Sequence, residues 1–182
     1  MKKVNFLFFA FVFFFMTFSG CGYTTRSMIS NKYKTIYVAP FVNKVDITQE
    51  AYYANKYRIY RPGLETDITR AVNNKYLFDG NLRPAKEEAA DLVLKGELVE
   101  FRKDPLRYED NNEDVAEYRV NVIVNLTLLD KKNNEEVWQE GSFTGDTTYF
   151  TSGTQAKSEE TAIIDAINDL ARRIVERTVE EW

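Results

Sequence analysis

Residues 116–129 read AEYRVNVIVNLTLL, and the alternation in this stretch decides the fold. The apolar set is Tyr118, Val120, Val122, Val124, Leu126 and Leu128, and the polar set is Glu117, Arg119, Asn121, Asn125 and Thr127. Only Ile123 breaks the pattern. A period of two predicts a strand of an antiparallel sheet with one covered face and one polar face. Water is the default neighbour of such a polar face, and a polar wall such as a barrel lumen is the alternative.

Three further stretches have the composition of strands. They are residues 35–41 (TIYVAPF), 91–102 (DLVLKGELVEFR) and a stretch at about 136–147. Pro40 is expected to end the first of them or to place it at the edge of the sheet. Asp104-Pro105 is expected to end the second, which should carry a bulge near Gly96 and lead into an acidic loop over residues 104–115.

Two stretches have the period of a helix. Residues 64–76 (LETDITRAVNNKY) carry one apolar stripe, Pro62 precedes them, and Gly80 closes the unit. The second helix begins after Ser158, a predicted N-cap, and runs to the end of the chain. The chain order is strand-helix-strand-strand-strand-helix. It predicts an α+β fold, with two helices packed on one face of a four-stranded, mainly antiparallel or mixed sheet.

Composition excludes several kinds of chemistry. The 182 residues include no histidine and one cysteine, Cys21, so a Ser-His-Asp triad, a Cys-His pair and a histidine or cysteine zinc site are ruled out. A formal charge of −4 does not suit nucleic-acid binding. Carboxylates such as Asp110, Glu113 and Asp114 remain, but a solvated loop explains them best. We expect no enzymatic activity, metal or cofactor, and keep a carboxylate-based hydrolase as a minor alternative.

The N-terminus reads as a lipoprotein signal. Residues 1–20 carry two lysines and then an apolar core of about 15 residues, shorter than the roughly 20 that a membrane span needs. Cys21 follows Phe18-Ser19-Gly20, the arrangement of a lipobox, which predicts lipidation at Cys21 and anchoring by acyl chains. Gly22, the residue after the lipobox cysteine, favours sorting of the lipoprotein to the outer membrane. The predicted organisation is a signal peptide over 1–20, which is removed, a lipidated cysteine and tether over 21–34, and a single domain over 35–182.

Two groups of residues are candidates for binding. Basic side chains lie where alternate strands are expected to exit at one edge of the sheet: Arg102, Lys103, Arg107 and Lys157. Lysine and arginine suit phosphate or carboxylate ligands. The second group, Tyr52, Tyr53 and Tyr57, lies in a Tyr-rich stretch over residues 47–61, which suits either an interface or packing onto its own domain. Loss of the signal peptide takes the formal charge from −4 to −6, so any anion must be bound locally.

The mature chain resembles the LptE family of outer-membrane lipoproteins. The matching features are Cys21-Gly22-Tyr23, TIYVAPFVN, Gly63-Leu64-Glu65, ADLVLKGELVEF, AEYRVNVIVNLTLLD and a terminal helix that ends at Trp182. Each is weak alone, but their order and spacing behind a lipobox are specific. The resemblance implies two helices on a four-stranded sheet, which agrees with the reading of the residues.

The resemblance also implies a role. LptE-like proteins plug and help assemble a large barrel, LptD, and assist lipopolysaccharide transport to the outer leaflet. The partners expected here are therefore an LptD-like barrel, lipopolysaccharide and, through the anchor, the membrane. Lys157 loosely matches a family position that contacts lipopolysaccharide phosphates, and Arg107 lies in the matching hairpin region. Arg102 and Lys103, at the end of the same predicted strand, are further candidates for this contact. Arg119, Asn121 and Asn125 on the polar face, with Tyr52, Tyr53 and Tyr57, are candidate contacts to the barrel. The alternative is another envelope-assembly or secretion-complex lipoprotein adaptor of similar fold.

Overall fold

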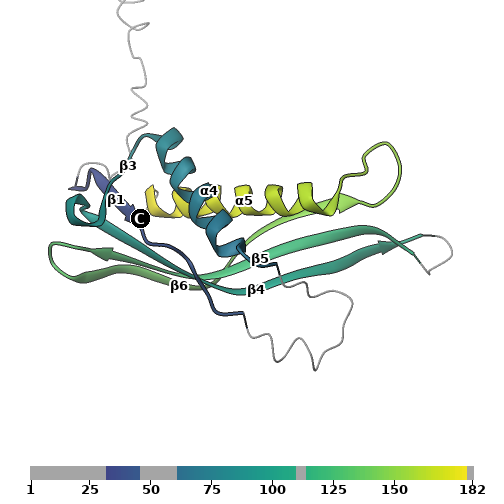
Figure 1. The fold of residues 1–182 in the computed structure, drawn as a ribbon, viewed down its shortest axis with the longest axis horizontal. Helices are drawn as coiled ribbons and strands as arrows, with labels where there is room; N and C mark the ends of the chain where they lie inside the picture. The colour runs from purple at the N-terminus through teal and green to yellow at the C-terminus, as the bar shows by residue number, and fades with distance from the viewer. Residues whose placement is uncertain (1–31, 46–60, 110–113, 180–182) are drawn as a thin grey trace, which may run out of the picture.

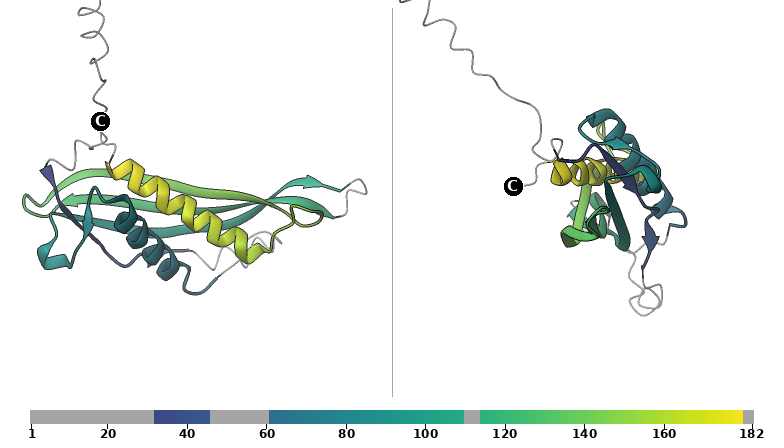
Figure 2. Two further views of the ribbon diagram at one scale, coloured as in Figure 1. Left: turned by 90° about the horizontal axis from the view of Figure 1, so that it is seen from above. Right: turned by 90° about the vertical axis from the view of Figure 1, so that its left-hand side faces the viewer.

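The computed structural model describes residues 32–45, 61–109 and 114–179. In these ranges the chain forms an elongated, twisted sheet with both long helices laid on one face of it (Figures 1 and 2). Within the same ranges, neither helix is long and apolar enough to cross a lipid bilayer. The α+β class and the placement of two helices on one face are confirmed.

Across the described residues the sheet is mixed and has six strands. Their bounds are β1 Thr35–Val38, β2 Val42–Asn43, β3 Arg83–Pro84, β4 Leu92–Tyr108, β5 Val115–Asp130 and β6 Glu135–Phe150. The order across the sheet is β3-β1-β4-β5-β6, and β2 also pairs with β4. β1 runs parallel to β3 and β4, β2 runs parallel to β4, and β4, β5 and β6 form antiparallel pairs.

The prediction of four strands is therefore too low. The four predicted strands correspond to β1, β4, β5 and β6, in the predicted chain order. The two that were missed, β2 and β3, have two residues each. Two residues cannot display a period of two, so nothing in the sequence marks them as strands. The chain that forms β2 lies beyond Pro40, which ends β1 as expected.

β4 is longer than predicted and does not end at Asp104-Pro105. It pairs with β5 as far as Tyr108, opposite Val115, so the loop predicted over residues 104–115 is confined to the tip of this hairpin. β1 and β2 pair with β4 only up to Leu98, so among the described residues the later part of β4 has a strand on one side only. A proline without an N–H is tolerated at such an edge. The expected bulge is present, with a register shift between Leu98 and Glu100.

The alternation along β5 places the core as predicted. Val120, Val122, Val124, Leu126 and Leu128 are all buried on the face that carries the helices. β4 adds Leu92, Leu94, Leu98 and Phe101 to this core. The face away from the helices holds the polar set.

The two helices pack on the sheet and on each other. α4 spans Leu64–Asp79 and buries Leu64, Ile68, Val72 and Tyr76, and Gly80 closes it with a φ of 78°. α5 spans Glu159–Val179 and buries the expected stripe of Ile163, Ile167, Leu170 and Ile174. Ser158 caps α5, since its Oγ accepts a hydrogen bond from the N–H of Thr161 at 3.1 Å. The Tyr76 hydroxyl donates to Thr178 Oγ1 at 2.8 Å and so joins the two helices in the core.

The domain has two distinct ends. At one, which we name the tether end, the chain enters at Lys32 beside the end of α4, β3 and the β5–β6 turn (Figure 1). At the other, which we name the hairpin end, the β4–β5 hairpin and the segment between β6 and α5 lie together. β4 has 17 residues, so at about 3.3 Å per residue it extends over about 55 Å between these ends.

Candidate binding surfaces

Lys103 lies at the centre of a half-buried cluster at the hairpin end. Its Nζ forms an ion pair of 2.5 Å with Glu159 Oε2 and lies 4.7 Å from the centroid of the Tyr118 ring. The Tyr149 hydroxyl donates to the same carboxylate at 3.2 Å, and the rings of Tyr118 and Tyr149 stack 5.7 Å apart. Burial, followed by the charge of Glu159, raises the pKa of Tyr149 above its usual range. The side chain of Lys103 is only 14% exposed, so its charge interacts within the domain and is poorly accessible to a ligand.

Arg107 and Lys157 lie at the same end and are far more accessible. The Arg107 guanidinium lies 5.7 Å from the centroid of Phe150 and 3.4 Å from Glu117 Oε2, and 65% of its side chain is exposed. The backbone N–H of Lys157 donates to the carbonyl of Phe150 at 3.1 Å, and its Nζ pairs with Asp165 at 2.9 Å. Both basic residues thus border Phe150, and each keeps a charged group at the surface with an acid beside it.

Arg102 is separated from the other three basic residues. It pairs in register with Asn121 of β5, on the face away from the helices, whereas Lys103 pairs with Val120 on the core face. Its guanidinium contacts Asp104 at 2.9 Å and Glu100 at 3.6 Å. The structure therefore gathers Lys103, Arg107 and Lys157 at one end, as the common exit of β4 and β6 predicts, and places Arg102 on the open face of the sheet.

The three strand residues proposed as barrel contacts lie on that open face, and each has a partner in the sheet. Arg119 lies 3.9 Å from Asp146 of β6 and remains half exposed. Asn121 is buried, and its side-chain amide donates to Asp104 at 2.8 Å. The Asn125 side-chain oxygen accepts from the N–H of Ser142 at 3.0 Å, where β6 bulges. Arg119 is consequently the most available of the three.

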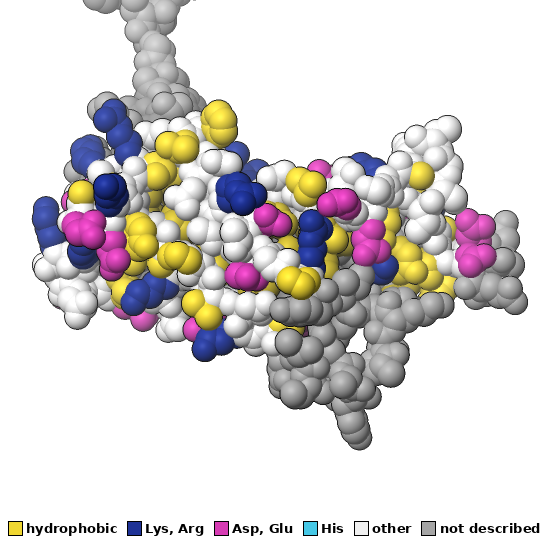
Figure 3. Space-filling model, viewed as in Figure 1, with side chains coloured by type: hydrophobic (Ala, Val, Ile, Leu, Met, Phe, Trp, Pro, Cys, Tyr) yellow, Lys and Arg dark blue, Asp and Glu magenta, His cyan; other side chains and the backbone are white. Residues whose placement is uncertain are grey.

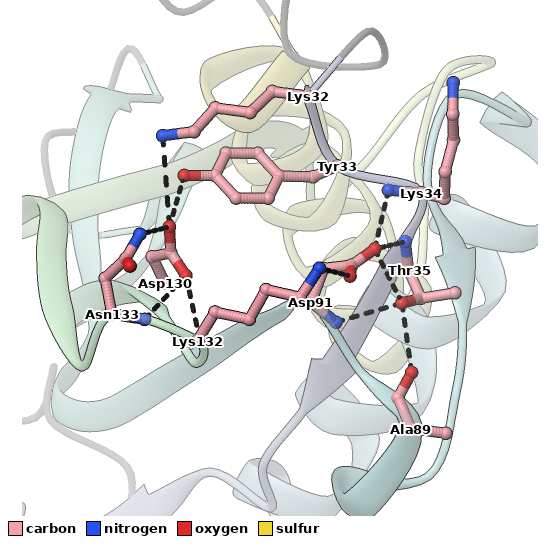
Figure 4. A network of polar contacts seen from close by, with 9 residues as sticks. All are labelled: Lys32, Tyr33, Lys34, Thr35, Ala89, Asp91, Asp130, Lys132 and Asn133. Carbon is pink, nitrogen blue, oxygen red and sulfur yellow. Dashed lines mark hydrogen bonds and ion pairs between the residues drawn. The ribbon is translucent and has the colours of Figure 1, made fainter.

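A polar network at the tether end was not expected from the sequence (Figure 4). Tyr33, which the sequence prediction places in the tether, is buried, and its hydroxyl donates to Asp130 Oδ2 at 2.8 Å. Asn133 donates to the same oxygen at 2.9 Å, and Lys32 Nζ lies 3.9 Å from it. The Tyr33 hydrogen bond is the main reason that the pKa of Asp130 lies below its usual range. The network fastens the chain at its entry to the turn between β5 and β6.

Asp91, next to the start of β4, also binds the chain where it enters the domain (Figure 4). Its carboxylate accepts from the backbone N–H groups of Lys34 at 2.9 Å and Thr35 at 3.1 Å, and these bonds lower its pKa. In return the Thr35 hydroxyl accepts from the N–H of Asp91 at 2.9 Å. The only sequence signal for either acid was its place at the end of a strand, beside a turn.

Several predicted residues lie outside the described ranges. They are Cys21, Tyr52, Tyr53 and Tyr57, together with the acids Asp110 and Glu113. Within residues 32–45, 61–109 and 114–179, no group of three or more histidine, cysteine or acidic residues is placed to hold a metal ion.

Comparison with known proteins decides the family. A sequence model described as LptE, lipopolysaccharide-assembly, matches residues 33–178, which is almost all of the domain. The chain belongs to the LptE family. No curated protein matches the LptE-family chain in sequence.

Solved structures share the fold at low sequence identity. A hypothetical protein from Chlamydia trachomatis matches with a TM-score of 0.53 and 13% identity over 80% of this chain and 95% of its own. A protein from Xanthomonas campestris matches with a TM-score of 0.52 and 14% identity over 80% and 84%. An uncharacterized lipoprotein B from Nitrosomonas europaea matches with a TM-score of 0.51 and 15% identity over 87% and 90%. These similarities show that the fold is shared over most of each chain.

Proposed function

We propose that this LptE-family chain is an outer-membrane lipoprotein, anchored through Cys21, that plugs and helps assemble an LptD-like β-barrel and assists lipopolysaccharide transport to the outer leaflet. The family match over residues 33–178 carries this proposal. The role is one of holding and positioning, without enzymatic chemistry. The chain lies in the periplasm and in the lumen of its partner.

The open face of the sheet supports the contact with a barrel. Both described helices lie on the other face, so the polar side chains of β5 are turned away from the core (Figure 2). The lumen of a large barrel is lined by polar residues, which a polar sheet face can meet without burying unsatisfied groups. Among the polar side chains of β5 on this face, Arg119 is the one that keeps a charged group at the surface.

The hairpin end supports the contact with lipopolysaccharide. Arg107 and Lys157 present cations beside Phe150 at the end far from the anchor. Because the mature chain carries a formal charge of −6, such a contact depends on these few cations rather than on the overall field. Each cation has an acid partner, so a phosphate would bind by exchanging with a carboxylate.

Co-purification tests the main proposal. The tagged full-length chain, expressed in its own host, should recover an LptD-like barrel from solubilised outer membranes. We expect Arg119→Glu on the open face to reduce the recovered barrel at least fivefold. The control is Arg172→Glu, which makes the same charge reversal on the outer surface of α5, where the Arg172 side chain is 44% exposed and pairs with Asp169 and Glu176. A chain that is always recovered without a barrel would refute the proposal.

Two further experiments separate the alternatives. Depletion of the chain should remove lipopolysaccharide from the cell surface, whereas intact surface lipopolysaccharide would favour another envelope-assembly or secretion-complex adaptor. The fold alone allows that alternative, since it is shared at 13–15% identity by the neighbours described above. For the anchor, Cys21→Ser should abolish incorporation of labelled fatty acid, and unchanged labelling would contradict the assignment.

A further inference from the structure

The last turn of α4 exposes two adjacent apolar side chains. Leu77 is 64% exposed and Phe78 is 88% exposed, the highest values among the large apolar side chains that the structure describes. Both lie off the stripe through which α4 contacts the core, which ends at Tyr76. In Figure 3 apolar side chains reach the surface over this end of α4. Adjacent exposed apolar residues of this size commonly mark a contact surface.

This apolar turn lies where the chain enters the domain. Gly80 ends α4 two residues after Phe78, and β3 then pairs with β1. The backbone N–H of Arg83 donates to the carbonyl of Lys34 at 2.9 Å, so the end of α4 and the entry of the chain are held together. Lys32 lies eleven positions after Cys21, and at about 3.5 Å per residue this stretch spans at most about 40 Å. A lipid anchor at Cys21 would therefore keep this end of the domain close to the bilayer.

The charges around the turn fit a lipid surface. Lys75, Arg83 and Lys86 have no ion-pair partner in the described part of the chain, unlike the cations of the hairpin end. Three exposed acids, Asp79, Glu87 and Glu88, balance them. The formal charges of these six residues sum to zero, so an anionic bilayer would not repel the turn. The apolar side chains of Leu77 and Phe78 then determine whether the turn binds the bilayer. Long basic side chains also keep their charge at headgroup level while their stems lie along apolar surface.

We propose that Leu77 and Phe78 insert into the headgroup–acyl boundary of the bilayer that holds the acyl chains of Cys21. This inference rests on the proposed lipidation and adds a second point of attachment beside it. Interfacial elements of this kind insert to a depth of roughly 5–10 Å. Two attachment points fix an orientation, whereas a tether alone does not. The tether end is held at the membrane face, and the hairpin end with Arg107 and Lys157 lies at the opposite end of the domain.

Spin labels on the lipidated full mature chain test this contact. Because Cys21 is the sole cysteine and its thiol is acylated, Phe78→Cys or Ile164→Cys supplies one free thiol. Ile164 is the matched control, being half exposed on α5 near the hairpin end. The protein is reconstituted in vesicles of phosphatidylethanolamine and phosphatidylglycerol at 3:1. We expect the label at Phe78 to be at least threefold more accessible to oxygen than to a polar nickel complex, relative to the label at Ile164.

A second set of variants shows whether the two side chains act together. With the label on Leu77→Cys, adding Phe78→Asp should restore access of the nickel complex, and adding Ile164→Asp should not. Labels at Leu77 and Phe78 that are as open to nickel as the label at Ile164 would overturn the proposal. So would protection that persists without vesicles, because a second copy of the chain would then cover the turn. A second label, on Cys21 itself, would be detected by mass and would refute lipidation instead.

Discussion

Gly145 of β6 lies directly against the backbone of Leu170 of α5. A Cβ on Gly145 would come within 2.3 Å of Leu170 Cβ and 2.5 Å of its backbone nitrogen. Gly145 pairs with Val122 partway along β6, the strand at the edge of the described sheet, and its neighbours in β6 are also bound to α5. The N–H of Asp146 donates to Asp169 at 3.1 Å, and Arg173 donates to the carbonyl of Thr144 at 3.3 Å. The glycine lets α5 approach closely enough to cover the outer edge of β6 there.

Gly145→Ala should therefore destabilise the domain. The added methyl group meets helix backbone, which cannot rotate away, so we expect a loss of about 1–3 kcal/mol in the free energy of unfolding, as for other overpacked sites. Urea denaturation measures it. Gly141→Ala is the matched control in the same strand, since a Cβ there has its nearest atom at 3.7 Å, an ordinary contact. Equal stability of the two variants would show that α5 does not rest on Gly145.

Stability should decline in acid because two carboxylates are bound in the folded state. Tyr33 and the N–H of Lys34 are the first causes of the low pKa values of Asp130 and Asp91. The unfolded carboxyls take up protons near a pKa of about 3.9, whereas the folded ones remain ionised to lower pH. The unfolded state then binds more protons, so the free energy of unfolding is constant above about pH 5 and falls as the pH drops through about 4.

The double variant Asp91→Asn with Asp130→Asn should flatten this decline. Urea unfolding between pH 3 and pH 7 measures the slope. The control is Glu88→Gln on the short 3-10 helix Glu87–Ala89, where the side chain is exposed, and its slope should match that of the natural chain. An unchanged slope in the double variant would mean that other acids cause the decline.

Local patterns predict the long elements of the fold and fail for the short ones. The alternation over residues 116–129 specified β5 and its buried face, because a strand with one covered face must alternate. β3 exists only because Arg83–Pro84 is held beside β1, and no local signal marks it. The continuation of β4 past Pro105 is likewise a tertiary effect. It depends on the absence of a strand on one side of β4, within the described residues, and this follows only from the assembled sheet.

The sequence predicts which basic residues gather at one end of the sheet, but not which side chains they contact. β4 and β6 are separated by one antiparallel strand and therefore run in the same direction. Both strands end at the same end of the sheet, which places Lys103 and Lys157 there. Their partners Glu159 and Asp165 come from α5, whose position over the sheet is not encoded locally. Tyr33 stands in a polar stretch and gives no sign of burial before its partner Asp130 is in place.

The pairing of Lys103 with Glu159 should contribute measurably to stability. Lys103 is largely enclosed, and its carboxylate partner also accepts from Tyr149, so the charges are screened less than at the surface. A double-mutant cycle of Lys103→Met and Glu159→Gln should give a coupling free energy of about 1–2 kcal/mol. The comparison cycle is Arg107→Met with Glu117→Gln, where the arginine is mostly exposed, and about 0–1 kcal/mol is expected. A larger coupling in the second cycle would contradict this assignment.

The exposed cations of the hairpin end should determine affinity for lipopolysaccharide. Replacing both in the variant Arg107→Ala with Lys157→Ala removes two charge-assisted contacts to phosphate, so we expect at least a tenfold loss in binding of fluorescent lipopolysaccharide to the purified chain. Arg70→Ala with Arg172→Ala is the matched control, because it removes the same charge from two exposed ion pairs on the outer surfaces of α4 and α5. Its affinity should change less than twofold at physiological salt. Equal losses in the two double variants would mean that lipopolysaccharide responds to net charge alone, and the hairpin end would not be its site.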